Sequence, residues 1–440
     1  MIIDFQFGNF KSLLEFQTFS MRAAHKRKND NGMDEENVFT TPFDLRMLKT
    51  KAIYGANASG KSNIAQAFEA FMLMVKSTEE QEELVKKIWS ERFRLNGNKE
   101  ELAMTFQLIF TFENGIYRFG FQIQDEKIKS EWLFRTEAGH LASEEAFYFR
   151  KNSGIECNEK YITKGSAYLQ LLDKETEGTF RSDVLFLTSV AAKGQESFIK
   201  IREAILNAIT IDGTNSKPGL QLALHILDKG DPSELQSLKN FMRYSDIGIH
   251  DFLLADLPLS SQGDARHPLM QDYKSGFKPL NSMHQKYGDN NRPFNKLHQD
   301  DFFKWESKGS VKLLGIGAIV LRTLKNGQAL LIDEFDSSLH PNLRLKIFNL
   351  FNSKITNPNN AQLIVITHDV GLMRGSKLRR DQIVLVNKDQ YGRSTLKTLI
   401  EFKGIRKDES FEKEYLAGSY AAVPNLSQLD ISVIGFLNQI

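Results

Sequence analysis

The chain has 440 residues, with 57 lysines and arginines against 55 aspartates and glutamates, and a single cysteine, Cys157. Its length allows a large core and two lobes, while its near-neutral charge neither favours nor excludes a nucleic-acid partner. One cysteine excludes a disulfide framework and a cysteine-based zinc site within the chain, which fits a reducing cytoplasm. We expect no membrane partner, because no apolar run could cross a bilayer without charges and the N-terminus lacks a signal-peptide pattern.

The N-terminal part of the chain predicts a pair of strands, an exposed loop, and then a strand followed by two helices. Apolar residues alternate within residues 1–21, which is typical of paired strands. The polar and charged composition of residues 24–45 favours an exposed loop. Residues 51–54 predict a short strand, residues 63–75 have the apolar spacing of a helix, and residues 79–90 predict a charged helix.

The segment between this strand and helix, residues 55–62, has the most specific chemistry. It reads Gly-Ala-Asn-Ala-Ser-Gly-Lys-Ser, which fits the phosphate-binding loop pattern G-x-x-x-x-G-K-[ST]. In such a loop, backbone N–H groups face phosphate oxygens, Lys61 supplies a mobile cation, and Ser62 offers a hydroxyl to Mg²⁺. The alternative is an ordinary Gly/Ser turn. The predicted nucleotide-binding residues here are Gly55, Asn57, Ser59, Gly60, Lys61 and Ser62.

The middle of the chain predicts an antiparallel meander and then helices. Residues 103–135 contain three strand-like runs with a tight turn after the first, which is typical of a meander and not of a β–α–β unit. Residues 165–250 are mostly helical in pattern, with amphipathic runs at 198–209 and 232–244. No heptad pattern is sustained, so we expect no long coiled-coil arm. The polar composition of residues 258–300 predicts a long loop or a loosely ordered insertion.

A predicted buried strand, Ala329–Ile332, ends in two acids. A continuous apolar run of this kind is typical of a strand inside a parallel sheet. We expect Asp333 to lie near Mg²⁺ and Glu334 to orient or deprotonate the attacking water. A capping Asp-Glu pair at a strand end is the alternative, and the complete phosphate loop upstream argues against it.

Two further elements favour nucleotide chemistry. Ser307 and Gly309 precede a predicted helix at 311–324, where a hydroxyl, backbone N–H groups and the helix dipole could bind a γ-phosphate. The alternative is a plain helix N-cap. Another apolar strand, residues 362–366, is followed by Thr-His, and His368 could contact a γ-phosphate and the water. Its alternative is a structural histidine. The order and spacing of the four elements favour the nucleotide roles.

With these motifs in this order, the chain resembles the ABC-type ATPases, a group that includes the SMC and RecF-like proteins. It looks closer still to AAA family ATPases of the bacterial abortive-infection and overcoming-lysogenisation-defect group, which act in phage defence. The stretches that carry this closer resemblance are Phe7–Ser12, Asp246–Ile249, Glu306–Ser310, Asp333–Pro341 and Tyr415–Tyr420.

The resemblance implies an α/β fold, namely an ABC-type P-loop ATPase core with an antiparallel β-meander and an inserted helical lobe. We expect residues 1–100 and 301–440 to form the core, residues 101–165 a β subdomain of the ATPase head, and residues 166–300 the inserted lobe. The implied cofactors are ATP and Mg²⁺. The implied assembly is a homodimer, or a higher even oligomer, that sandwiches ATP.

Three departures from the family pattern limit this comparison. His340 stands where ABC proteins usually have an aspartate after the Ser-x-Leu run. No Q-loop glutamine can be placed with certainty, since Gln107 is a candidate but also fits an outward-facing strand residue. Many relatives carry a C-terminal Toprim nuclease domain, and we expect none here because few residues follow His368.

Three functions compete. The first is an ATPase that senses infection or regulates a separately encoded toxin or nuclease effector in anti-phage defence. The second is a DNA-repair or DNA-clamping ATPase, for which Arg374, Lys377, Arg379 and Arg380 form a short basic cluster, although a solvated helix end is the better explanation of the cluster. A transporter ATPase is the third, and the large insertion argues against it.

Overall fold

The computed structural model describes residues 1–25, 34–77, 81–95, 102–137, 144–151, 154–161, 183–212, 217–245, 248–254, 279–294, 297–375, 378–403 and 410–423. The chain divides into two compact units. The first unit contains Met1–Ala208 and Ile364–Ile440, and the second contains Ile209–Leu363.

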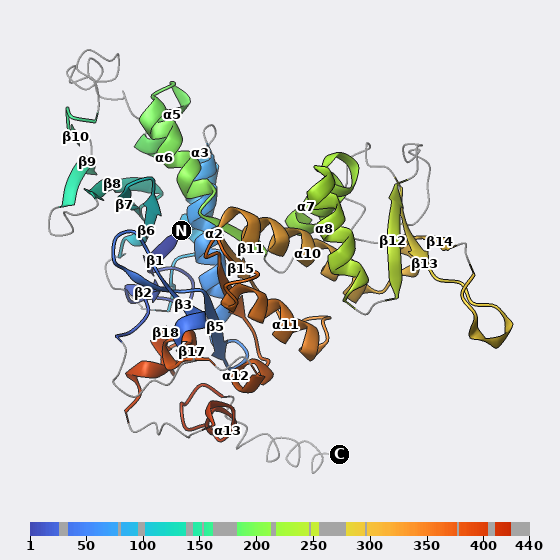
Figure 1. Ribbon diagram of the computed structural model, residues 1–440. Helices are drawn as coiled ribbons and strands as arrows, with labels where there is room; N and C mark the ends of the chain where they lie inside the picture. Colours follow the sequence, from blue (N-terminus) through green and yellow to red (C-terminus); the bar gives the residue numbers. More distant parts are fainter. Residues whose placement is uncertain are drawn as a thin grey trace, which may run out of the picture. The chain divides into compact units, whose positions relative to one another are not determined.

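The first unit contains a seven-stranded antiparallel sheet with the strand order β10-β9-β8-β7-β6-β1-β2 (Figure 1). Tight turns join β6 to β7 and β7 to β8, and Glu113 and Asp125 in these turns have positive φ. The expected meander is therefore confirmed, and it continues into β9 and β10. The strands are β1 (Ile2–Gly8), β2 (Gln17–Ser20), β6 (Met104–Phe112), β7 (Gly115–Gln124), β8 (Lys127–Glu137), β9 (Glu144–Lys151) and β10 (Gly154–Cys157).

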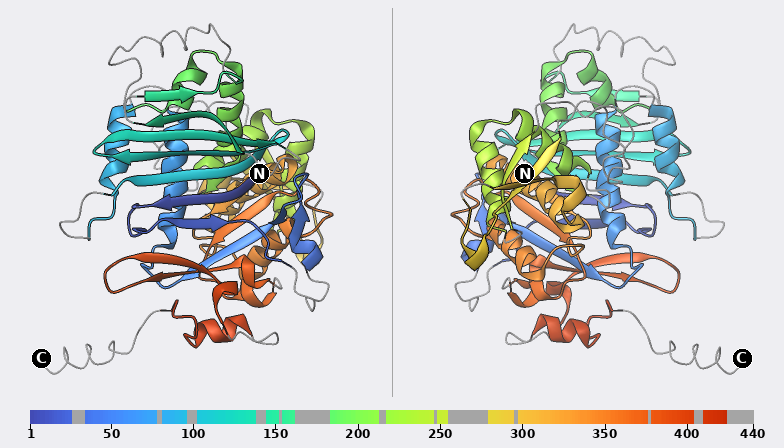
Figure 2. Two further views of the ribbon diagram at one scale, coloured as in Figure 1. Left: turned by 90° about the vertical axis from the view of Figure 1, so that its left-hand side faces the viewer. Right: turned by 90° about the vertical axis from the view of Figure 1, so that its right-hand side faces the viewer.

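Helix α2 (Lys61–Lys76) crosses one face of this sheet, as Figure 2 shows. Its apolar face lies on an aromatic core, in which Phe68 stacks on Phe5 at 3.8 Å and Phe71 stacks on Phe121 at 5.7 Å between ring centroids. Burying each such ring stabilises the fold by about 1.5–3 kcal/mol. The helix that begins at the phosphate loop is therefore held firmly along its length.

A second group of strands in the first unit carries the phosphate loop. Strand β5 (Thr50–Gly55) pairs in parallel with β17 (Ile383–Lys388), which pairs antiparallel with β18 (Ser394–Thr398). The end of β16 (Gln362–Ile366) also belongs to this unit. All six residues of β5 are buried, as expected for a strand covered on both faces.

Shorter elements complete the first unit. The hairpin of β3 and β4 follows a single turn of helix, and helices α5 and α6 follow the meander. The remaining elements are α1 (Asp34–Asn37), β3 (Val38–Thr40), β4 (Arg46–Leu48), α3 (Gln81–Ser90), α5 (Phe186–Ala192), α6 (Glu196–Leu206), α12 (Gly371–Gly375), η3 (Arg380–Gln382), η4 (Leu399–Glu401) and α13 (Phe411–Leu416).

The second unit combines a parallel strand pair, helices and a small antiparallel sheet. Strand β11 (Ile209–Asp212) pairs in parallel with β15 (Ala329–Ile332), and β12 (Ile249–Leu254), β13 (Leu280–His284) and β14 (His298–Asp301) form the small sheet. A Cβ at Gly219 would lie 2.8 Å from the Gly315 carbonyl oxygen, so glycine lets two helices pack closely. The helices are α7 (Lys217–Lys229), α8 (Pro232–Arg243), η2 (Asp289–Asn291), α9 (Phe302–Trp305), α10 (Lys308–Asn326) and α11 (Pro341–Asn352).

The described residues confirm an α/β fold with an antiparallel meander, and two local expectations were wrong. Residues 24–45 are not simply an exposed loop, because α1 and β3 lie there and Val38, Phe39 and Phe43 are buried. Part of the expected loop at 258–300 is strand, namely β13 and β14, while residues 255–278 lie outside the described residues. The division into a core, a β subdomain and a helical lobe stays a prediction. No helix in the described ranges is long and apolar enough to span a membrane.

Candidate functional site

The phosphate-loop sequence forms the connection between β5 and α2 in the first unit. Two glycines are needed for its path. A Cβ at Gly55 would lie 2.5 Å from the Val386 carbonyl oxygen, and Gly60 has φ +99° where it caps the N-terminus of α2. Ala58 also has a positive φ, of 60°. In loops of this kind, the first backbone N–H groups of the following helix face the bound phosphate.

Lys61 folds back over this loop. Its Nζ donates to the carbonyl oxygens of Gly55 at 2.9 Å and Ala56 at 2.7 Å, and the residue is 6% exposed. Ser62 follows it at the start of α2, Ser59 is buried, and Asn57 is exposed on the loop. The loop therefore holds its lysine ammonium at its own centre, where an anion would meet it.

Hydroxyl groups of Ser12 and Ser394 contact the phosphate loop and the start of α2. The Ser394 Oγ lies 2.6 Å from both the Ser59 carbonyl oxygen and the Ser12 Oγ, and the Asn63 amide donates to the Ser12 Oγ at 2.6 Å. Ser12 follows β1 and Ser394 begins β18, so both come from segments far from the loop in sequence. Sequence reasoning noted Ser12 only within a resembling stretch and missed Ser394, for which no local pattern exists.

His368 lies beside the end of β5, in the same unit as the phosphate loop. The Thr367 N–H donates to the Ile53 carbonyl oxygen at 3.1 Å, and the Tyr54 hydroxyl donates to the Asp369 carbonyl oxygen at 3.3 Å. These two bonds hold the residues on either side of His368, whose own side chain is exposed whereas Thr367 is buried. The position suits a side chain that meets a nucleotide from the strand end.

The second unit places the two acids at the end of β15. Asp333 is buried, its N–H donates to the Asp212 carbonyl oxygen at 3.0 Å, and its Oδ1 accepts the Glu334 N–H at 2.9 Å. Glu334 is exposed and has φ 50°, in the left-handed region. The chain thus turns sharply at Glu334, so the first acid stays in the fold while the second faces solvent.

Asp212 and Lys312 lie next to these acids, and sequence reasoning missed both. Asp212 ends β11, and burial raises its pKa to about 6, against the opposing attraction of Lys312. Burial also lowers the pKa of Lys312, although Asp212 and Glu334 favour its charged form. The Lys312 Nζ donates to the Glu334 carbonyl oxygen at 3.1 Å.

Ser307 and Gly309 lie at the start of α10. Ser307 is the N-cap residue, and its Oγ accepts the Ser310 N–H at 3.1 Å. This is the contact that the simple N-cap alternative predicts. A Cβ at Gly309 would lie 2.7 Å from the Ser338 carbonyl oxygen, so glycine allows the helix to approach the turn after Glu334. The phosphate-binding role of the pair stays a prediction.

Comparison with known proteins identifies the family. The model of a family described as "AAA domain, putative AbiEii toxin, Type IV TA system" matches residues 52–153 and 227–374, which is more than half of the chain. The chain belongs to this AAA-domain family. Among solved structures, the chain is similar to the SMC head domain from Thermotoga maritima, with 14% sequence identity, coverage of 90% of this chain and 98% of that chain, and a TM-score of 0.39. No curated protein matches the chain.

Within this AAA-domain protein, the phosphate-loop residues and His368 lie together in the first unit, and Asp333, Glu334, Ser307 and Gly309 lie together in the second. The Gln107 side chain is 8% exposed and accepts hydrogen bonds from Trp132 at 2.7 Å and Arg118 at 3.1 Å. Because Gln107 alternates along β6 with Phe106, whose ring lies in the aromatic core under α2, its side chain lies on the opposite face of the sheet. The two bonds tie its amide oxygen to neighbouring strands, and its role as a Q-loop glutamine stays a prediction. His340 caps α11 through its Nδ1, which accepts the Asn342 N–H at 3.2 Å.

The basic cluster is not a uniform cationic surface. Arg379 is an ion-pair partner of Asp381 at 2.7 Å and is largely buried, whereas Arg374 is exposed and lies 3.8 Å from Glu412. Lys377 lies outside the described residues. At least one of the four basic side chains, Arg379, is thus engaged in an ion pair within the fold.

Proposed function

We propose that this AAA-domain protein binds ATP with Mg²⁺ and hydrolyses it to ADP and phosphate. The observation that carries the proposal is the phosphate loop, in which a left-handed Gly60 and a buried Lys61 lie between a buried strand and a well-anchored helix. Ser62 and Asp333 offer a hydroxyl and a carboxylate, the hard oxygen donors that Mg²⁺ binds together with phosphate oxygens. When bound, Mg²⁺ would neutralise phosphate charge.

In the proposed reaction, water attacks the γ-phosphorus. The bond between that phosphorus and the β–γ bridging oxygen breaks, and the oxygen leaves with ADP. Glu334 accepts the proton of the water as general base, which suits its exposed carboxylate beyond a buried strand. Lys61 and the loop N–H groups bind the phosphates, and His368 contacts the γ-phosphate and helps to position the water.

The direct test is phosphate release from ATP by the purified chain, with Mg²⁺ and with excess chelator. We expect slow, Mg²⁺-dependent release that Lys61→Ala abolishes. Lys76→Ala, at the exposed far end of the same helix, is the matched control and should behave as the unchanged chain. Release that is equal in the chain and in Lys61→Ala would refute the assignment of this loop.

We further propose that ATP joins two copies of the chain, as a homodimer or a higher even oligomer. The support is the exposed Ser307 hydroxyl at the N-terminus of the 19-residue helix α10, where N–H groups and the dipole favour an anion. In ABC-type ATPases, which the chain resembles, such a motif serves the nucleotide of a second copy. Light scattering of Glu334→Gln should therefore show ATP-dependent dimers. A monomer at every ATP concentration would reject the sandwich.

The biological role that we propose is a sensor or regulator in bacterial anti-phage defence, acting on a separately encoded toxin or nuclease effector. The family description, which names a putative toxin and a toxin–antitoxin system, supports this direction. The DNA-clamping alternative has less support, because Arg379 is paired within the fold. Expression of the chain alone and with its operon neighbour, followed by phage challenge, tests the role. Protection by the chain alone would contradict a separate effector.

A further inference from the structure

The turn after β15 is held by two basic side chains through its backbone. The Lys312 Nζ, from α10, donates to the Glu334 carbonyl oxygen at 3.1 Å, and the Arg344 Nη1, from α11, donates to the Asp336 carbonyl oxygen at 2.9 Å. The Ser337 N–H also donates to the Glu334 carbonyl oxygen, at 2.9 Å. The Glu334 carbonyl oxygen therefore accepts two hydrogen bonds, one from a lysine side chain of α10 and one from the backbone of the turn.

This support matters because Glu334 has an unfavourable backbone conformation. A residue other than glycine in the left-handed region costs roughly 1–2 kcal/mol, so its surroundings must stabilise it. Glu334 has φ 50°, and its carbonyl oxygen is the acceptor that Lys312 contacts. Without the Lys312 bond, the turn would lose one of the interactions that keep this conformation and hence the direction of the Glu334 carboxylate.

Asp212 supplies the opposite charge for Lys312. It lies at the end of β11, next to Asp333 at the end of the parallel strand β15, and it is 3% exposed. Its Oδ1 is buried and has no hydrogen-bond partner in the described part of the chain. The electrostatic attraction of Asp212, together with that of Glu334, Asp336 and Asp333, offsets part of the cost of burying Lys312.

We propose that Lys312 is a positioning residue for ATP hydrolysis, which fixes the Glu334 turn with Asp212 as its counter-charge. The inference rests on the proposed ATPase function. Lys312 does not touch the nucleotide in this account. It acts on the proton-accepting step only through the orientation of Glu334, so its loss should lower kcat and leave ATP binding unchanged.

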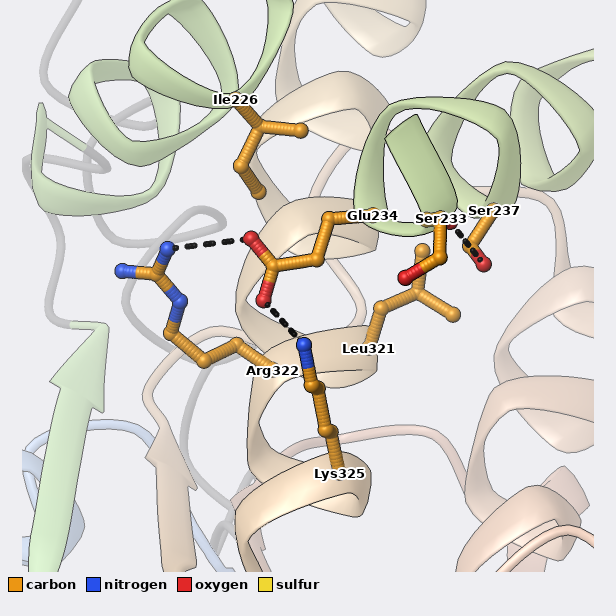
Figure 3. A pocket seen from close by; sticks show the side chains of 7 residues that line it. All are labelled: Ile226, Ser233, Glu234, Ser237, Leu321, Arg322 and Lys325. Carbon is orange, nitrogen blue, oxygen red and sulfur yellow. Dashed lines mark hydrogen bonds and ion pairs between the residues drawn. The ribbon is translucent and has the colours of Figure 1, made fainter. Parts of the chain in front are cut away.

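The same helix provides a matched control. Lys325 lies on α10 and is ion-paired with Glu234 at 2.9 Å and Asp231 at 3.3 Å. Figure 3 shows it beside Glu234, which also faces Arg322, in a surface hollow that these residues line with Ile226 and Leu321. Lys312→Met and Lys325→Met each remove one lysine ammonium group from α10, and each of these groups lies near acidic side chains. Only Lys312→Met also removes a hydrogen bond to the turn after Glu334.

The experiment measures kcat, KM and equilibrium ATP binding for the full chain and its variants. We expect Lys312→Met to lower kcat roughly 10- to 100-fold, as for a misplaced reacting group, with KM and ATP affinity within about twofold. Lys312→Arg, which keeps the donor, should regain most of kcat. Asp212→Asn should lower kcat in the same sense but less. Lys325→Met should match the unchanged chain.

A double variant separates positioning from a general structural effect. Because Lys312 acts through Glu334, adding Lys312→Met to Glu334→Gln should not lower the single-turnover rate further. Additive losses, an unchanged kcat in Lys312→Met, or an Arg variant as slow as the Met variant would each overturn the inference. If Lys312→Met does not fold, Asp212→Asn decides instead: a lower kcat with unchanged ATP affinity supports the inference, and an unchanged kcat overturns it. An unchanged chain that neither binds nor hydrolyses ATP would reject the proposed function instead.

Discussion

The Tyr415 ring lies 5.9 Å from the Tyr54 ring, and burial raises the pKa of the Tyr415 hydroxyl, a shift that the neighbouring backbone of Gly55, the first residue of the phosphate loop, partly opposes. Tyr415 belongs to α13, near the C-terminal end of the described residues, and its hydroxyl also donates to the Ala422 carbonyl oxygen at 3.3 Å. A segment distant in sequence therefore supports the strand end from which the loop departs.

Tyr415→Phe should weaken ATP binding several-fold, because it removes the hydroxyl bond to Ala422 and the hydroxyl's contact with the Gly55 backbone while it keeps the ring. A hydrogen bond of this kind contributes about 0.5–1.5 kcal/mol. Calorimetric titration with ATP measures the effect. Tyr391→Phe is the control, since Tyr391 is 61% exposed. Equal affinities in the two variants would show that the Gly55 contact does not support the loop.

Gly60→Ala should destabilise the first unit and impair ATP binding more than Gly194→Ala. Both glycines have similar positive φ, of +99° and +94°, so each substitution carries a backbone cost of roughly 1–2 kcal/mol. Only Gly60 is crowded, because its Cβ would overlap the Ser394 and Ser12 hydroxyls, whereas nothing lies within 4 Å of a Cβ at Gly194. Urea unfolding measures the difference, and equal losses would contradict the crowding argument.

Lys51 gives a prediction for the pH dependence of stability. Burial lowers its pKa from 10.5 to about 8, although Asp381 and Asp4 oppose the shift. Between about pH 8 and pH 10.5, the unfolded chain binds a proton that the folded chain releases, so stability rises with pH. The contribution of this group should rise by roughly 3 kcal/mol across that window. Lys51→Met should lack the rise, and Lys86→Met, at an exposed position, should keep it.

His368→Ala should bind ATP as the unchanged chain does and hydrolyse it much more slowly. The exposed imidazole is held beside the end of β5 by its neighbours Thr367 and Asp369, so its removal should leave the backbone there intact. Binding and turnover are measured on one preparation. Unchanged turnover would restore the alternative in which His368 is only structural.

The sequence predicted those parts of the site whose chemistry is local. The phosphate loop is a single run of eight residues, and the acids Asp333 and Glu334 follow one apolar strand, so composition and order were sufficient to propose them as site residues. Ser394 and Tyr415 could not be predicted, because the fold brings them to the loop from the C-terminal part of the chain. Lys312 is one of many lysines on helices, and only the structure reveals its bond to Glu334.

For the fold, too, the sequence predicted long elements with a regular local pattern and missed short ones. Strand alternation identified the meander, since period-two patterns over long strands are unambiguous. Strand β11 has four residues, two of them apolar isoleucines, within a region of helical pattern, so its pairing with β15 was not visible. Val38 and Phe39 were missed because the charged residues before them dominate the local composition.

The central claim is that this chain hydrolyses ATP with Lys61 for binding and Glu334 for turnover. Its most direct test is a paired measurement of equilibrium ATP binding and phosphate release for the unchanged chain, Lys61→Ala and Glu334→Gln. The account predicts that Lys61→Ala loses binding, and that Glu334→Gln binds ATP normally but releases phosphate at least about 100-fold more slowly. Normal phosphate release by Glu334→Gln, or normal ATP affinity in Lys61→Ala, would contradict the account.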